Sequence, residues 1–116
     1  MTAPLRIHRD SGAPPFVTAH RGLSSQAPEN TLAAFRRAVE AGADMLELDV
    51  HLTADDRVAV IHDRTLQRTT TGNGGVRSYT SGEISEFDAG SWFDPEFTTE
   101  RVPMLEEDRP PGPELA

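Results

Sequence analysis

Residues 45–63, MLELDVHLTADDRVAVIHD, constrain the fold more than any other stretch of the chain. Aliphatic residues at positions 46, 48, 50 and 52 alternate with Glu47, Asp49 and His51. In a strand this alternation places the polar set on one face. Two carboxylates left unpaired in a packed interior are costly, and a hard divalent cation with oxygen ligands would remove that cost. The pattern therefore predicts one strand that carries two candidate metal ligands, Glu47 and Asp49.

The same stretch continues into a tight turn and a second strand. The turn covers residues 53–56, TADD, and the apolar run 58–61, VAVI, is expected to return antiparallel. The run delivers His62, whose imidazole titrates near neutral pH. An edge strand with one solvent face, followed by an ordinary loop histidine, is the alternative that the residues leave open.

A short strand is predicted upstream at residues 16–19, FVTA, followed by His20, Arg21 and Gly22. Barrel and open α/β folds place their chemistry at the ends of strands, which makes His20 and Arg21 candidate site residues. The alternative is a loop histidine beside a surface arginine.

A helix is predicted between the two strands. Asn30 is the expected N-cap, apolar residues at 32, 35 and 39 form its buried stripe, and Gly42 ends it. A strand, helix and strand in this order make a right-handed crossover between parallel neighbours. The sequence therefore predicts that His20 and Arg21 lie beside the Glu47 and Asp49 pair at one edge of the sheet.

Together these side chains make a plausible set for phosphoryl chemistry. Glu47 and Asp49 would hold a divalent cation, Arg21 would contact phosphate, and His20 and His62 would divide the proton transfers. The net charge of −8, from 11 basic and 19 acidic residues, argues against nucleic acid as the partner. An acidic chain that binds phosphate needs a metal or a local arginine to offset its own field.

Composition sets the remaining expectations. The 116 residues suffice for one modest domain, and the absence of cysteine excludes disulfides and thiolate metal sites. The N-terminus has no apolar signal region, and no run approaches the roughly 20 apolar residues that cross a membrane. A chain without a transmembrane segment, located in the cytoplasm, is expected.

An ordered series of motifs resembles the glycerophosphodiester phosphodiesterase family. The series comprises HRG (20–22), PENT (28–31), ELDV (47–50), VIHD (60–63), LQRTT (66–70), DAGSWF (88–93) and VPMLEE (102–107). Met104 stands where the family usually has threonine. Each motif alone is weak, whereas the whole series in this order is specific.

The resemblance implies an α/β fold, a TIM (β/α)8 barrel of the phosphatidylinositol-phosphodiesterase-like type. It implies hydrolysis of a small-molecule glycerophosphodiester to glycerol 3-phosphate and an alcohol, with Ca²⁺ or Mg²⁺ as cofactor. By motif position His20 and His62 are the acid/base pair, Glu47 and Asp49 metal ligands, and Arg21 a phosphate contact. In the family a glycerol hydroxyl of the substrate attacks phosphorus, and water opens the resulting cyclic phosphate.

The barrel is expected to be incomplete in this chain, because a TIM barrel takes about 250 residues. We expect a flexible lead-in at 1–15, a partial family domain at 16–107 with an insertion at about 64–99, and a disordered, proline-rich tail at 108–116. The family's third metal carboxylate comes from a later strand. Open strand edges would allow self-association. Two alternative functions stay open: a non-catalytic remnant or interaction module, and a phosphodiesterase resembling lysophospholipase D or sphingomyelinase D.

Overall fold

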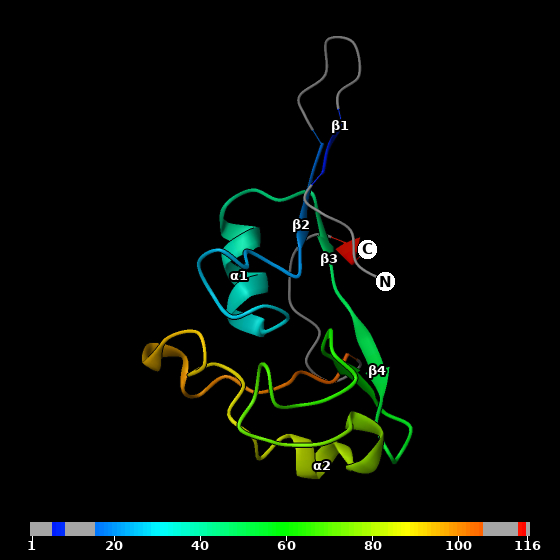
Figure 1. The fold of residues 1–116 in the computed structure, drawn as a ribbon. Helices are drawn as coiled ribbons and strands as arrows, with labels where there is room; N and C mark the ends of the chain where they lie inside the picture. Colours follow the sequence, from blue (N-terminus) through cyan, green and yellow to red (C-terminus); the bar gives the residue numbers. More distant parts are fainter. Residues whose placement is uncertain (1–5, 9–15, 106–113, 116) are drawn as a thin grey trace.

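The computed structural model describes residues 6–8, 16–105 and 114–115. Its main sheet has the order β1-β2-β3-β6, built from short strands: β1 (Arg6–His8), β2 (Phe16–His20), β3 (Met45–Glu47) and β6 (Glu114–Leu115). β1 is antiparallel to β2, whereas β2, β3 and β6 run parallel (Figure 1). Apart from β1 and β6, the predicted lead-in and tail lie outside the described residues.

Helix α1 (Leu32–Glu40) connects β2 to β3 and confirms the predicted crossover. Its N-cap is Thr31, whose Oγ1 accepts a hydrogen bond from the N–H of Ala34 at 3.3 Å. The prediction of Asn30 as N-cap was wrong by one residue, because Asn30 has φ +58° and its side chain reaches into the strand edge. Gly42 follows the C-cap with φ +88°, as predicted.

The apolar stripe of α1 packs on the sheet. One cluster of buried residues joins helix and strands: Ala19, Phe35, Ala38, Leu46 and Val60. Burying a side chain the size of Phe35 contributes about 1.5–3 kcal/mol relative to leaving it exposed. The cluster fixes β2 beside β3 in the register that sets His20 opposite Glu47.

The single strand predicted at 45–52 is instead two strands. β3 ends at Glu47, and β4 (Val50–Leu52) pairs antiparallel with β5 (Val58–Val60), as predicted for the returning run. The break falls at residues 48–49, where the backbone N–H of Asp49 donates to the side-chain Oδ1 of Asn30 and not to a neighbouring strand. The Asp49 carbonyl accepts from the N–H of Ile61, in the register of the β4–β5 pair. After the break, Val50 and Leu52 of β4 are exposed, whereas Leu46 of β3 is buried.

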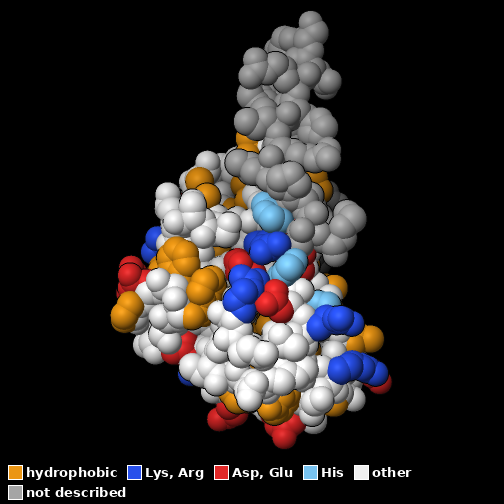
Figure 2. Space-filling model, viewed as in Figure 1, with side chains coloured by type: hydrophobic (Ala, Val, Ile, Leu, Met, Phe, Trp, Pro, Cys, Tyr) orange, Lys and Arg blue, Asp and Glu red, His pale blue; other side chains and the backbone are white. Residues whose placement is uncertain are grey.

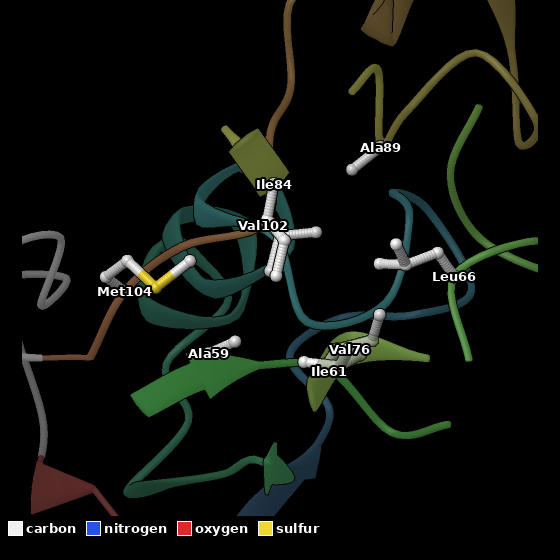
Figure 3. Packing of buried hydrophobic residues seen from close by; sticks show 8 residues of the cluster. All are labelled: Ala59, Ile61, Leu66, Val76, Ile84, Ala89, Val102 and Met104. Carbon is white, nitrogen blue, oxygen red and sulfur yellow. The ribbon is translucent and has the colours of Figure 1, made fainter. Parts of the chain in front are cut away.

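Residues 64–99 form turns around short helices: η1 (Val76–Ser78), α2 (Ser81–Ile84) and η2 (Pro95–Phe97). Side chains from this segment, from β5 and from residues 102–104 share one core (Figure 3). Its buried members are Ala59, Ile61, Leu66, Val76, Ile84, Ala89, Val102 and Met104. A capping box between Thr80 and Glu83 begins α2.

The aromatic side chains within residues 91–97 pack against one another. Trp92, Phe93 and Phe97 make successive edge-to-face contacts with ring centroids 5.7 and 5.8 Å apart. Within the described ranges, no helix has the length and apolar character that a membrane crossing requires.

Candidate functional site

His20 and Glu47 face each other across the parallel pair β2 and β3. His20 Nε2 lies 3.7 Å from Glu47 Oε1. The backbone N–H of Arg21 contacts both the Glu47 carbonyl, at 2.8 Å, and Oε1, at 3.2 Å. Burial raises the pKa of Glu47, the charge of Asp49 raises it further, and His20 and Arg21 partly oppose the change. The Glu47 carboxylate is therefore held where another positive charge would stabilise its ionised form.

Asp49 is the second buried carboxylate, with 4 % of the residue exposed. Its Oδ2 accepts a hydrogen bond from Asn30 Nδ2 at 3.1 Å and lies 3.3 Å from Arg21 Nε. Its Oδ1 is buried and has no hydrogen-bond partner among the residues that the structure describes. A buried carboxylate oxygen without a donor is costly, and a ligand at this position would remove the cost.

The turn after β2 aims the arginine. Arg21 and Gly22 both have positive φ, +59° and +80°. A Cβ at Gly22 would lie 2.8 Å from the carbonyl carbon of Ala34, so only glycine fits against α1. The backbone N–H of Asn30 donates to the Arg21 carbonyl at 3.0 Å, which ties this turn to the start of the helix.

His62 follows β5 and is oriented from both sides. Its Nδ1 lies 2.8 Å from Asp63 Oδ1, and His51 Nε2 donates to its carbonyl at 2.8 Å. Hydrogen bonds from Arg68 are the main reason that the pKa of Asp63 is lowered to about 2. The ionised Asp63 only accepts, so His62 Nδ1 is the donor and Nε2 of the neutral ring keeps its lone pair.

The structure brings four of the five predicted site residues into direct contact: His20, Arg21, Glu47 and Asp49. His62 stands one residue after Ile61, whose N–H donates to the Asp49 carbonyl at 2.9 Å. Figure 2 shows histidine, arginine and acidic side chains gathered in the middle of one face. These are the side chains expected at a site for an anionic ligand.

Sequence reasoning missed the side chains that connect the predicted ones. Glu29 contacts Arg21 and Arg68, Arg68 also contacts Asp63, and Asn30 holds Asp49. Glu29, Asn30 and Arg68 each stand inside one of the motifs. The only sign of their role in the sequence was that a charged or amide residue lies in a loop directly beside a predicted element. Such residues are typical of surfaces, so their pairing came only from the fold.

The carboxylates fit a hard divalent cation in part. Glu47 and Asp49 offer oxygen ligands only, one of these oxygens lacks a donor, and burial opposes the charge of Glu47. Among residues 6–8, 16–105 and 114–115, no three histidine or acidic side chains are grouped closely enough to hold a metal ion. The described part of the chain thus offers two candidate ligands, Glu47 and Asp49, which is fewer than the three grouped side chains that a metal site needs.

Comparison with known proteins identifies the source of this arrangement. The glycerophosphoryl diester phosphodiesterase family matches residues 20–110. A glycerophosphodiester phosphodiesterase from Caldanaerobacter subterraneus subsp. tengcongensis is 55 % identical over 92 residues, which are 79 % of this chain and 38 % of that protein.

Solved structures agree. A glycerophosphodiester phosphodiesterase from Agrobacterium tumefaciens str. C58 matches with a TM-score of 0.75 and 51 % identity, over 76 % of this chain and 38 % of that chain. An Oleispira antarctica phosphodiesterase, in complex with the product sn-glycerol-3-phosphate, matches with a TM-score of 0.76 and 43 % identity, over 78 % of this chain and 37 % of that chain.

The chain thus spans less than two fifths of the length of these relatives. The predicted fold class is confirmed: β2, α1 and β3 are consecutive elements of a TIM barrel that is partial in this chain. The motifs lie in order within the matched residues, and they build the strand edge described above. The chain belongs to the glycerophosphoryl diester phosphodiesterase family.

Proposed function

We propose that this chain carries the N-terminal part of the active site of a metal-dependent glycerophosphodiester phosphodiesterase. The observation that carries the proposal is the register of β2 and β3, which sets His20 opposite Glu47 and brings Arg21 onto Asp49. The substrate would be a small glycerophosphodiester, and the products glycerol 3-phosphate and an alcohol. The names of the relatives support this reaction.

Arg21 would bind the phosphate. Its guanidinium is held by Glu29, with NH1 3.3 Å from both carboxylate oxygens, and by Asp49. A guanidinium fixed in this way presents its remaining N–H groups to a phosphate as a rigid fork. Glu47 and Asp49 would hold Ca²⁺ or Mg²⁺, and the bound ion would polarise a phosphoryl oxygen.

The two histidines would move the protons. His62 Nε2 would accept the proton of the glycerol hydroxyl whose oxygen forms a bond to phosphorus, while His20 gives a proton to the alcohol oxygen as its bond to phosphorus breaks. The resulting cyclic phosphate would be opened by water with the two roles reversed. No serine or cysteine nucleophile is needed in this scheme.

Turnover of glycerophosphocholine by the purified 116-residue chain, with Ca²⁺ or Mg²⁺, tests the proposal. We expect glycerol 3-phosphate and choline, with the rate lost in Glu47→Ala and kept in Glu40→Ala, whose side chain is exposed at the end of α1. Turnover that survives Glu47→Ala contradicts the assigned site. A folded chain without turnover favours the alternative of a non-catalytic interaction module.

The remaining expectations have direct checks. Comparing glycerophosphocholine with lysophosphatidylcholine separates the glycerol diester from the lysophospholipase D-like alternative. Sedimentation during turnover tests self-association through open strand edges, which would bring further ligands to Glu47 and Asp49. The cytoplasmic location stays a prediction, which fractionation of expressing cells would check.

A further inference from the structure

Charged side chains of alternating sign form a continuous line from His62, after β5, to Asp49, after β3. From His62 the line passes through five residues: Asp63, Arg68, Glu29, Arg21 and Asp49. Every neighbouring pair is 2.8–3.3 Å apart at its closest atoms. The members come from five separate stretches of the sequence, at positions 21, 29, 49, 62–63 and 68, so the line exists only in the fold.

Arg68 is the centre of this line and contacts two carboxylates at once. Its Nε and NH2 donate to Asp63 Oδ2 and Oδ1 at 2.8 and 3.0 Å. Its NH2 and NH1 donate to Glu29 Oε2 and Oε1 at 2.8 and 3.3 Å. The two acids raise the pKa of Arg68, so it stays charged. Only a planar fork of donors reaches two carboxylates in this geometry, and lysine does not provide one.

Each of the two carboxylates that Arg68 holds contacts a predicted site residue: Asp63 contacts His62, and Glu29 contacts Arg21. Asp63 accepts from His62 Nδ1 and thereby selects the ring tautomer. Glu29 accepts from Arg21 and from Arg68, so it spaces the two guanidiniums. Without Arg68, Asp63 would lose two of its three hydrogen bonds and would be free to rotate away from the imidazole.

We propose that Arg68 is a positioning residue that locks His62 in the Nδ1–H tautomer through Asp63 and holds Arg21 in place through Glu29. This role in catalysis rests on the function proposed above, whereas the role in setting the tautomer does not. A purely structural Arg68, tying two loops together, would change the stability of the chain without changing the His62 tautomer.

The test is ¹⁵N NMR of the histidine rings in the wild-type chain, Arg68→Met and Arg77→Met. Arg77 is the matched control, because it also pairs with a carboxylate, that of Asp56 at 3.0 Å, outside the line. A His62→Gln spectrum assigns the signals. We expect the Nδ1–H form of His62 to predominate at neutral pH in wild type and Arg77→Met, and the Nε2–H form to predominate in Arg68→Met. An unchanged His62 tautomer in folded Arg68→Met overturns the proposal.

If Arg68→Met does not fold, Arg68→Lys carries the same test. It keeps the charge and loses the fork, so we expect a smaller shift toward Nε2–H, and no shift would again overturn the proposal. In the turnover assay we expect Arg68→Met to lose about 10-fold to 100-fold in kcat/KM, by analogy with the partners that orient metal-ligating histidines, with partial rescue by lysine. A tautomer that shifts in a chain without turnover would overturn the proposed function and uphold the tautomer lock.

Discussion

Replacing Asn30 by alanine tests how the strand edge holds the Asp49 carboxylate. Asn30 is 3 % exposed, its Nδ2 donates to Asp49 Oδ2 at 3.1 Å, and its Oδ1 accepts from the Asp49 N–H at 3.4 Å. Its backbone has φ +58°, a region that asparagine tolerates and alanine does not. Two separate costs therefore follow from the same substitution.

The two costs have known sizes. Removing a hydrogen bond to a charged group costs about 1.5–3 kcal/mol. Placing alanine in the left-handed region costs roughly 1–2 kcal/mol. We therefore expect Asn30→Ala to lower the free energy of unfolding by about 2.5–5 kcal/mol, the sum of these two ranges. Asn30→Gly removes the same side chain without the backbone cost, so we expect it to lose about 1.5–3 kcal/mol.

Urea denaturation of the three chains, followed by circular dichroism, measures both differences. The reasoning requires alanine to be less stable than glycine at this position by about 1–2 kcal/mol. Equal stability of the two variants would show that the backbone of residue 30 is not held in the left-handed region. An Asn30→Ala chain as stable as wild type would show that Asp49 does not depend on Asn30.

Three further predictions concern packing and pH. A Cβ at Gly90 would clash with the backbone carbonyl oxygen of Phe97, so Gly90→Ala has to move backbone atoms. We therefore expect Gly90→Ala to lower the midpoint of urea denaturation by more than the substitution of an exposed residue does. The pKa of Asp63 is lowered to about 2, chiefly by Arg68, so ionised Asp63 stabilises the fold above pH 4 and this contribution is lost as the pH falls towards 2. We therefore expect the difference in free energy of unfolding between wild type and Asp63→Asn to decrease over that pH range. Because burial raises the pKa of Glu47, its ionised form is disfavoured in the folded chain. In metal-free buffer we therefore expect Glu47→Gln to be more stable than wild type at pH 7, and the two chains to be equally stable at low pH.

Each of these has a control or a contradicting result. Gly82→Ala, where the nearest side-chain atom lies 3.9 Å from the new Cβ, should not be destabilised, and a loss equal to that of Gly90→Ala would refute the steric argument. A constant difference between Asp63→Asn and wild type from pH 5 to 2 would contradict the Asp63 assignment. A Glu47→Gln chain less stable than wild type at pH 7 would mean that Glu47 is stabilised in its charged form.

Much of the fold followed from periodicity and connectivity. The spacing of Leu32, Phe35 and Val39 specified a helix, and the crossover rule then placed β2 parallel to β3. That rule alone brought His20 beside Glu47 from distant parts of the sequence. These features depend on local pattern and chain handedness, which a sequence carries directly.

The features that could not be predicted depend on single tertiary bonds. The break between β3 and β4 falls where the Asn30 side chain bonds the backbone N–H of Asp49, and no alternation of side chains signals that bond. The Asn30 side chain bonds Asp49, and the N-cap of α1 is Thr31, whose Oγ1 accepts from the N–H of Ala34. The pairing of Arg68 with Glu29 joins two loops that are 39 residues apart in the sequence, and no local pattern signals their contact.

Binding of glycerol 3-phosphate tests the central claim most directly, because it asks for a ligand site without asking for a complete reaction. Isothermal titration of the chain with glycerol 3-phosphate would be run in Ca²⁺ or Mg²⁺ and again with chelator, for wild type, Glu47→Ala and Glu40→Ala. The account predicts binding that requires the divalent cation, is lost in Glu47→Ala and is kept in Glu40→Ala. Binding that persists in Glu47→Ala, or a folded wild-type chain that binds neither cation nor ligand, would contradict it.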